Sequence, residues 1–138
     1  MSLVLDSSAS LAWHFEDERT PLLMALLDRV TEEGATVPSL WRFETANGLQ
    51  MAVRRKRIDT AYRERALRNL SALNIRIDVA SESLAWSTTV GLASLYDLTV
   101  YDAAYLELAQ RRRLPLASLD AALVRAAGRA GVAILPLT

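Results

Sequence analysis

The sequence predicts a single α/β domain in which helices cover both faces of a mainly parallel sheet, giving three layers in the order α/β/α. The length of 138 residues suits one domain. Hydrophobic residues make up 51% of the chain, enough for one sizeable core. Short apolar runs alternate with helical patterns over short connections, as in parallel strands linked by helices. We therefore expect a domain over 1–138 without internal repeats or linkers.

Five short runs of mostly apolar residues are the expected strands. The second run is stopped by Pro38, and the third alternates apolar with polar residues, which is typical of a strand with unlike faces. The expected strands are residues 3–5, 35–37, 75–79, 115–118 and 132–135. The sheet should therefore contain four or five strands.

Helical periodicity and capping residues mark the segments between the strands. Thr20 with Pro21 should begin a helix that Gly34 ends, and Ser39 and Asp59 should cap two more. The expected helices follow the SSAS segment at 7–10, and then lie at 21–33, 40–57, 60–73, 81–95, 102–112 and 121–129. Each strand except the last thus leads into a helix.

The composition excludes several kinds of site. The chain has no cysteine and one histidine, so thiolate zinc sites, cysteine nucleophiles and two-histidine ribonuclease chemistry are excluded. No glycine-rich phosphate-binding motif is present. With 16 basic and 16 acidic residues, any nucleic-acid contact must use a local patch. The start lacks a signal-peptide pattern and no run could span a bilayer, so we expect a cytoplasmic protein without a membrane partner.

Four acidic residues that lie far apart in the sequence are expected at one edge of the sheet. Asp6 ends the first strand, Asp120 follows the fourth, Asp102 begins a helix, and Glu44 lies early in the helix after the second strand. Ligands of open α/β sheets bind outside the carboxyl ends of strands. Two carboxylates about 4 Å apart repel by roughly 4 kcal/mol at an effective dielectric constant of about 20, and a divalent cation relieves this. All-oxygen ligands favour Mg²⁺ or Mn²⁺ over zinc.

Each acid also has a purely structural interpretation. Asp102 and Asp120 fit helix N-caps, and Glu44 fits a solvated helix position. Asp6 is harder to explain in this way, because a charge at the end of a buried strand needs a partner and none of the first 18 residues is Lys or Arg. Asn47, one turn after Glu44, could donate a hydrogen bond to it or lie at the surface.

Four segments of the chain resemble the PIN-domain ribonucleases, specifically toxins of the VapC type, in their order and spacing. These segments are VLDSSA, VPSLWRFETANGL, LTVYDAAYLELA and PLASLDAALVRAA. The resemblance covers nearly the whole chain and implies a compact α/β/α fold with a central parallel sheet. It places the acidic site on Asp6, Glu44, Asp102 and Asp120.

The same resemblance implies supporting roles for two serines. Ser8 and Ser118 match positions where a small polar residue supports the acids, and Ser118 keeps the hydroxyl of the threonine often found there. A fifth acid present in some members is not evident, which leaves the number of metal ions open.

The resemblance also implies what the protein does. It implies an endoribonuclease that uses Mg²⁺ or Mn²⁺ to activate water against RNA phosphodiesters, a cognate antitoxin protein as partner, and a homodimer. The local patch for RNA is expected at Arg54, Arg55, Lys56 and Arg57. The other interpretations of this run are a solvated helix end favoured by the helix dipole, and a salt-bridging surface for an acidic partner.

Three other classes of protein could also place acids in this way, and each requires residues that can be checked in the sequence. A phosphoacceptor signalling domain needs a Lys after a late strand, whereas the only lysine is Lys56 on a helix. An aspartate-nucleophile phosphatase needs D-x-D at the first strand, where this chain has Asp6-Ser7-Ser8. A non-catalytic binding module whose acids cap helices remains the alternative, and a stability response to Mn²⁺ separates it from the nuclease.

Overall fold

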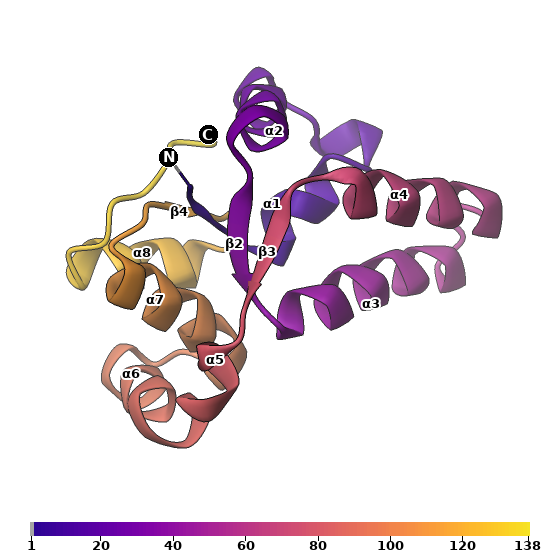
Figure 1. Ribbon diagram of the computed structural model, residues 1–138. Helices are drawn as coiled ribbons and strands as arrows, with labels where there is room; N and C mark the ends of the chain where they lie inside the picture. Colours follow the sequence, from indigo (N-terminus) through magenta and orange to yellow (C-terminus); the bar gives the residue numbers. More distant parts are fainter. Residues whose placement is uncertain (1) are drawn as a thin grey trace.

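The computed structural model describes residues 2–138 and has a four-stranded sheet between layers of helices (Figure 1). The strands are β1 (Val4–Leu5), β2 (Ala35–Pro38), β3 (Ile75–Asp78) and β4 (Leu116–Ala117). All paired strands are parallel, and their order across the sheet is β3-β2-β1-β4. The predicted parallel α/β/α fold is confirmed.

Burial differs between the inner strands and the edge strand β3. Every residue of β1, β2 and β4 is buried, as in parallel strands covered on both faces. In β3 the exposure varies along the strand, and Arg76 is exposed. The alternation in the sequence over residues 75–79 therefore marks a strand at the edge of the sheet.

The helices follow the strands in the predicted order. They are α1 (Ser7–Ala12), α2 (Pro21–Glu33), α3 (Leu40–Arg54), α4 (Thr60–Ala72), α5 (Ala80–Ser83), α6 (Val90–Tyr96), α7 (Val100–Arg112) and α8 (Ala121–Arg129). The Thr20 and Asp59 side chains cap α2 and α4 as predicted. Gly34 ends α2 with φ at 80°, and a Cβ there would lie 2.7 Å from the carbonyl oxygen of Asn74, so this turn requires glycine. None of the helices in residues 2–138 is long and apolar enough to cross a membrane.

Two predicted elements are shorter or more broken than expected. The helix over 81–95 is instead α5, a π-helical turn (Ala85–Thr89) and α6. Six of the fifteen residues from 81 to 95 are serine or threonine, and their hydroxyls compete for backbone groups. The predicted fifth strand over 132–135 is reduced to one bridge between Ile134 and Leu116, because β4 has only two residues to pair with.

Two helix boundaries also differ from the prediction. Ser39 does not cap α3, because its backbone is already helical and its hydroxyl donates to Oε1 of Glu82 at 2.5 Å. The α3 helix ends at Arg54 rather than at Arg57, since Lys56 adopts a left-handed backbone with φ at 60°.

The helices α1, α3 and α8 begin shortly after the carboxyl ends of the inner strands β1, β2 and β4. α7 is the central helix: all residues from Ala103 to Ala109 are buried, and it packs against β1 and β2. α3 packs against α1 at Gly48, where a Cβ would overlap a methyl of Leu11. This packing fixes the helices that carry Glu44 and Asp102.

Candidate active site

Asp6 lies at the carboxyl end of β1 with two hydroxyl groups directed at one oxygen. It is 3% exposed, and Oδ2 accepts hydrogen bonds from Ser8 Oγ at 2.8 Å and Ser118 Oγ at 2.6 Å. Burial raises the pKa of Asp6 and the charge of Asp120 adds to this, while the hydroxyl donors lower it; the net direction is upward. No ion pair reaches Asp6 within residues 2–138, so its charge is supported by serine hydroxyls and by a backbone hydrogen bond from Ser7.

Ser8 and Ser118 each do more than support Asp6. Ser118 Oγ accepts the backbone N–H of Asp120 at 3.0 Å, and Ser8 Oγ accepts that of Leu119 at 3.0 Å. The two hydroxyls therefore fasten the segment after β4 to the end of β1. Both serines contact Asp6, and their supporting role in a metal site stays a prediction.

Asp120 is both a helix cap and a neighbour of Asp6. Its Oδ1 accepts the N–H of Leu123 at 2.9 Å and so caps α8, and its charge raises the pKa values of Asp6 and Asp102. Asp120 can therefore cap α8 and also belong to the site, because the cap uses only one of its two carboxylate oxygens.

Glu44 is half-buried in the second turn of α3 and contacts a buried tyrosine. Tyr105 Oη donates to Glu44 Oε1 at 2.6 Å. Burial raises the pKa of Glu44, as does the charge of Asp6, and the hydrogen bond from Tyr105 lowers it. The pKa of Tyr105 is itself held above its ordinary value, chiefly by burial, so its hydroxyl remains a donor. Glu44 is therefore not the solvated helix residue that one interpretation expected.

Asp102 occupies the first turn of α7 but does not cap it. The cap is Thr99, whose Oγ1 accepts the N–H of Asp102 at 3.1 Å, so the cap interpretation of Asp102 is wrong. Burial raises the pKa of Asp102 to about 6, together with the charges of Asp120, Asp6 and Glu44. The charges of the other three acids thus act on Asp102, so all four acids lie close enough to interact. We call Asp6, Glu44, Asp102 and Asp120 the acidic cluster.

The acidic cluster has the donor chemistry of a site for a hard divalent cation. Within the described chain, none of its four side chains forms an ion pair with a basic residue. No three acidic or histidine side chains of residues 2–138 are placed to close directly on one ion. Mg²⁺, however, keeps several waters and is usually held by one or two carboxylates. The donor set therefore fits an ion that is bound partly through water.

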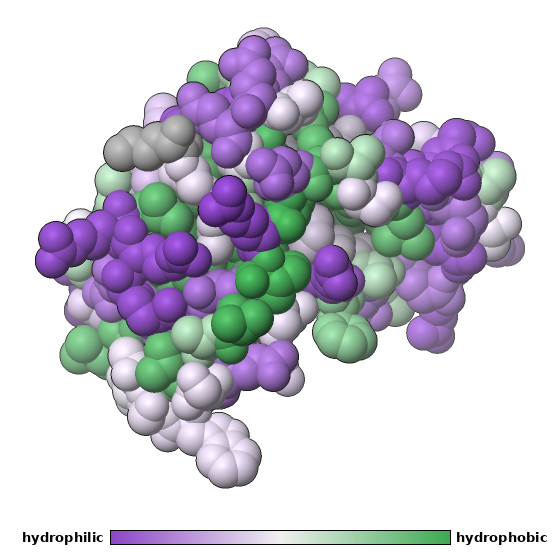
Figure 2. Space-filling model, viewed as in Figure 1, coloured by the Kyte–Doolittle hydropathy of each residue, from purple (hydrophilic) through white to green (hydrophobic). Residues whose placement is uncertain are grey.

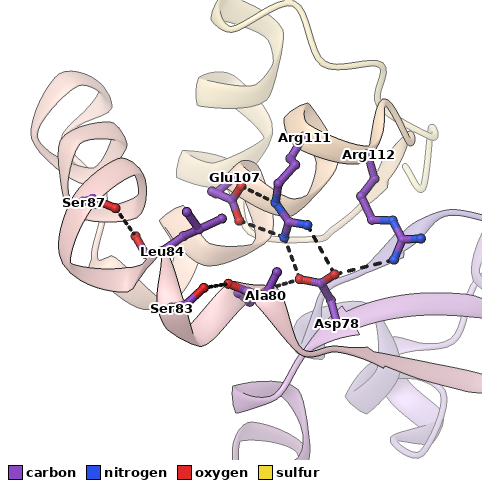
Figure 3. Close-up of polar contacts among 9 residues, drawn as sticks. Asp78, Ala80, Ser83, Leu84, Ser87, Glu107, Arg111 and Arg112 are labelled. Atoms are coloured by element: carbon purple, nitrogen blue, oxygen red, sulfur yellow. Dashed lines mark hydrogen bonds and ion pairs between the residues drawn. The ribbon is translucent and has the colours of Figure 1, made fainter.

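A further acid, Asp78, ends β3 but is neutralised by arginines (Figure 3). Arg111 contacts both of its oxygens, at 2.6 and 3.3 Å, and also holds buried Glu107 at 2.8 Å. Arg112 lies 3.5 Å from Asp78. Burial alone would raise the pKa of Asp78, but hydrogen bonds from Arg111 and Ser81 bring it below the ordinary value. We call Asp78, Glu107, Arg111 and Arg112 the Asp78 ion-pair network. Both of its acids are paired with arginines of the chain.

The basic run lies at the other end of α3 from the acidic cluster. Arg54 is ten residues from Glu44, roughly 15 Å along a helix. Arg54, Arg55 and Lys56 are exposed, whereas Arg57 pairs with Asp17 at 2.9 Å and lies 4.2 Å from the centre of the Phe15 ring. Arg57 is thus engaged within the chain, and contact of the run with RNA stays a prediction.

Two residues show where sequence reasoning fell short. Asn47 is exposed and forms no hydrogen bond with Glu44 in residues 2–138, so its supporting role stays a prediction. Tyr105, which does contact Glu44, was not predicted. Its spacing of three residues from Asp102 places both on one helix face, and this was the available signal.

Comparison with known proteins gives the family. Residues 3–129 match the PIN domain family. The fold is similar to the crystal structure of PAE2754 from Pyrobaculum aerophilum, with 23% identity over 98% of this chain and 90% of that one, and a TM-score of 0.70. It is also similar to that of FitAcB from Neisseria gonorrhoeae, with 14% identity over 97% of this chain and 96% of that one, and a TM-score of 0.64. No curated protein sequence matches. The family match covers most of the sequence, and the chain therefore belongs to the PIN domain family.

Proposed function

We propose that this protein is a Mg²⁺- or Mn²⁺-dependent endoribonuclease. PIN domains are nucleases, so the class of activity follows from the family. One observation carries the metal requirement: the pKa of Asp102 is raised to about 6 by burial and by the other three acids, while no basic residue of the described chain pairs with any of them. An uncompensated carboxylate group of this kind is relieved by a hard cation.

The residues of the acidic cluster have distinct parts in the proposed reaction. Asp6, Asp102 and Asp120 would hold the cation, directly or through water, and Glu44 would contribute to the same cluster. A bound Mg²⁺ or Mn²⁺ lowers the pKa of a coordinated water and offsets charge on the phosphate. Ser8 and Ser118 keep Asp6 oriented by holding Oδ2. No side-chain nucleophile is needed, and the products would carry 5′-phosphate and 3′-hydroxyl ends.

The partners belong to the same proposal. The four sequence segments that resemble VapC-type toxins support a cytoplasmic toxin of a type II toxin–antitoxin pair, with a protein antitoxin and a homodimer. Exposed apolar side chains offer surface for such contacts: Val79 is 88% exposed, Trp86 95% and Leu95 65%. Figure 2 shows hydrophobic residues across the middle of one face, and hydrophilic residues over the α3–α4 hairpin.

The test is RNA cleavage by the purified protein with Mg²⁺, followed by mapping of the new 5′ ends. Wild type should cut at defined positions and stop when EDTA is added, while Asp102→Asn should abolish the cuts. Asp97→Asn is the matched control, because Asp97 is exposed and its left-handed backbone tolerates asparagine. Cuts that persist in Asp102→Asn or in EDTA would contradict the proposal.

A further inference from the structure

We infer that Tyr105 is a positioning residue for Glu44, whose carboxylate it holds in the orientation that the cation site needs. This inference rests on the proposed function. The geometry behind it is one short hydrogen bond, 2.6 Å from Tyr105 Oη to Glu44 Oε1, between residues 61 positions apart in the sequence. It joins the two helices that carry Glu44 and Asp102.

The tyrosine ring has little freedom to move. Tyr105 is 0% exposed and is among the largest fully buried side chains of the described chain. Its ring belongs to the hydrophobic core, on the central helix α7, while its hydroxyl reaches Glu44 at the rim of the core. A buried tyrosine hydroxyl needs a polar partner, and Glu44 supplies it. The ring is thus fixed in the core, and its hydroxyl holds one oxygen of the Glu44 carboxylate in a defined position.

Tyr105 also forms a structural link between Asp102 and Glu44, two members of the acidic cluster. It lies three residues after Asp102 in α7, so both side chains project from one side of that helix. Asp102 and Glu44 come from different helices, and Tyr105 connects α7 directly to the carboxylate on α3. Outer partners that orient a ligand in this manner contribute to metal affinity although they do not touch the metal.

A purely structural role for Tyr105 makes a different prediction from a positioning role. A structural residue would affect Mn²⁺ binding through core packing, whether or not Glu44 keeps its charge. A positioning residue acts through Glu44, so its effect should vanish once Glu44 can no longer serve as an anionic ligand. A double-mutant cycle separates the two roles.

The experiment measures Mn²⁺ affinity by calorimetry for wild type, Tyr105→Phe, Glu44→Gln and the double variant. Tyr105→Phe keeps the ring and should weaken Mn²⁺ binding by about tenfold. In the Glu44→Gln background the same change should alter affinity by less than about twofold, within the additivity expected of uncoupled changes. Tyr62→Phe is the matched control, since it deletes a hydroxyl that donates to the His14 carbonyl at 2.7 Å, outside the acidic cluster.

Two results would overturn the inference: an unchanged affinity in Tyr105→Phe, or an equal loss in both backgrounds. If Tyr105→Phe does not fold, Glu44→Asp replaces it, because a side chain shorter by one methylene loses the contact while the ring stays. An affinity of Glu44→Asp equal to that of wild type would then count against the inference. Failure of the proposed function looks different, since wild type itself would neither bind Mn²⁺ nor cut RNA.

Discussion

Asp6 and Asp78 end two strands of the same parallel sheet, but the groups that contact their carboxylates are different. Both are nearly inaccessible, at 3% and 6% exposure. Asp78 is held by two guanidinium groups and its pKa is lowered, whereas Asp6 is held by serine hydroxyls and its pKa is raised. Chain topology gathers acids at this edge, but the arginines decide which acid is paired within the chain and which has no basic partner among the described residues.

The two regions should therefore respond in opposite ways to loss of charge. In the Asp78 ion-pair network, the arginines already supply the positive charge, so removal of Arg111 leaves the buried carboxylates of Asp78 and Glu107 without their main partner. In the acidic cluster, removal of one negative charge relieves repulsion but, if the proposed function holds, also removes a metal ligand.

The largest expected effect comes from removing Arg111. Arg111→Met leaves the buried carboxylates of Asp78 and Glu107 without their shared cation. Because the Arg111 side chain is partly exposed, we expect a cost at the low end of that for a broken buried pair, about 3 kcal/mol. The free energy of unfolding should fall by about that amount in urea denaturation. Arg112→Met is the control: its side chain is 45% exposed and makes a single contact at 3.5 Å, so its cost should stay below about 1 kcal/mol. Equal losses for the two variants would contradict the assignment of Arg111 as the central cation.

The same substitution at Asp6 and Asp78 should change metal-free stability in opposite directions. Asp78→Asn loses charged hydrogen bonds and should lower the free energy of unfolding by about 2 kcal/mol. Asp6→Asn can still accept from both serines and loses carboxylate repulsion, so stability should rise by about 1 kcal/mol.

Addition of Mn²⁺ completes this comparison in thermal unfolding experiments. Mn²⁺ should stabilise wild type and Asp78→Asn but have little effect on Asp6→Asn, because only the last lacks a cluster ligand. If Mn²⁺ stabilises none of the three proteins, the non-catalytic binding module becomes the better interpretation.

The smallest expected effect is a pH dependence of metal-free stability. The folded pKa of Asp102 is about 6, above its ordinary value of 3.8, so the folded state binds more protons than the unfolded state between these values. Stability should therefore rise as the pH falls from 7 towards 4. Because Asp102 is only half-buried, solvent screening reduces the expected gain to about 1 kcal/mol. Thermal unfolding in EDTA measures it, and Asp102→Asn should flatten the profile; an unchanged slope in that variant would assign the effect to other groups.

Topology and the apolar pattern made much of the fold and the acidic cluster predictable. Buried parallel strands require apolar runs, and an acid that ends such a run, as Asp6 does, is conspicuous. Parallel strands also bring their carboxyl ends to one edge, so distant acids can be expected to meet there.

Features that depend on a specific three-dimensional contact could not be predicted in this way. Tyr105 resembles an ordinary core aromatic until its hydroxyl is placed beside Glu44. The pairing of Arg111 with Asp78 joins residues 33 positions apart, which no local pattern encodes. Ser39 fits a helix cap by type, yet Glu82 from a later segment takes its hydroxyl.

The open edge of the sheet has a consequence for how the protein behaves at high concentration. β3 offers unpaired backbone groups along one side, and an incoming strand from another molecule would have to pack beside the exposed guanidinium of Arg76 in the middle of the strand. Charged residues on edge strands discourage such pairing. We therefore expect Arg76 to disfavour edge-to-edge pairing of β3 with strands of other molecules.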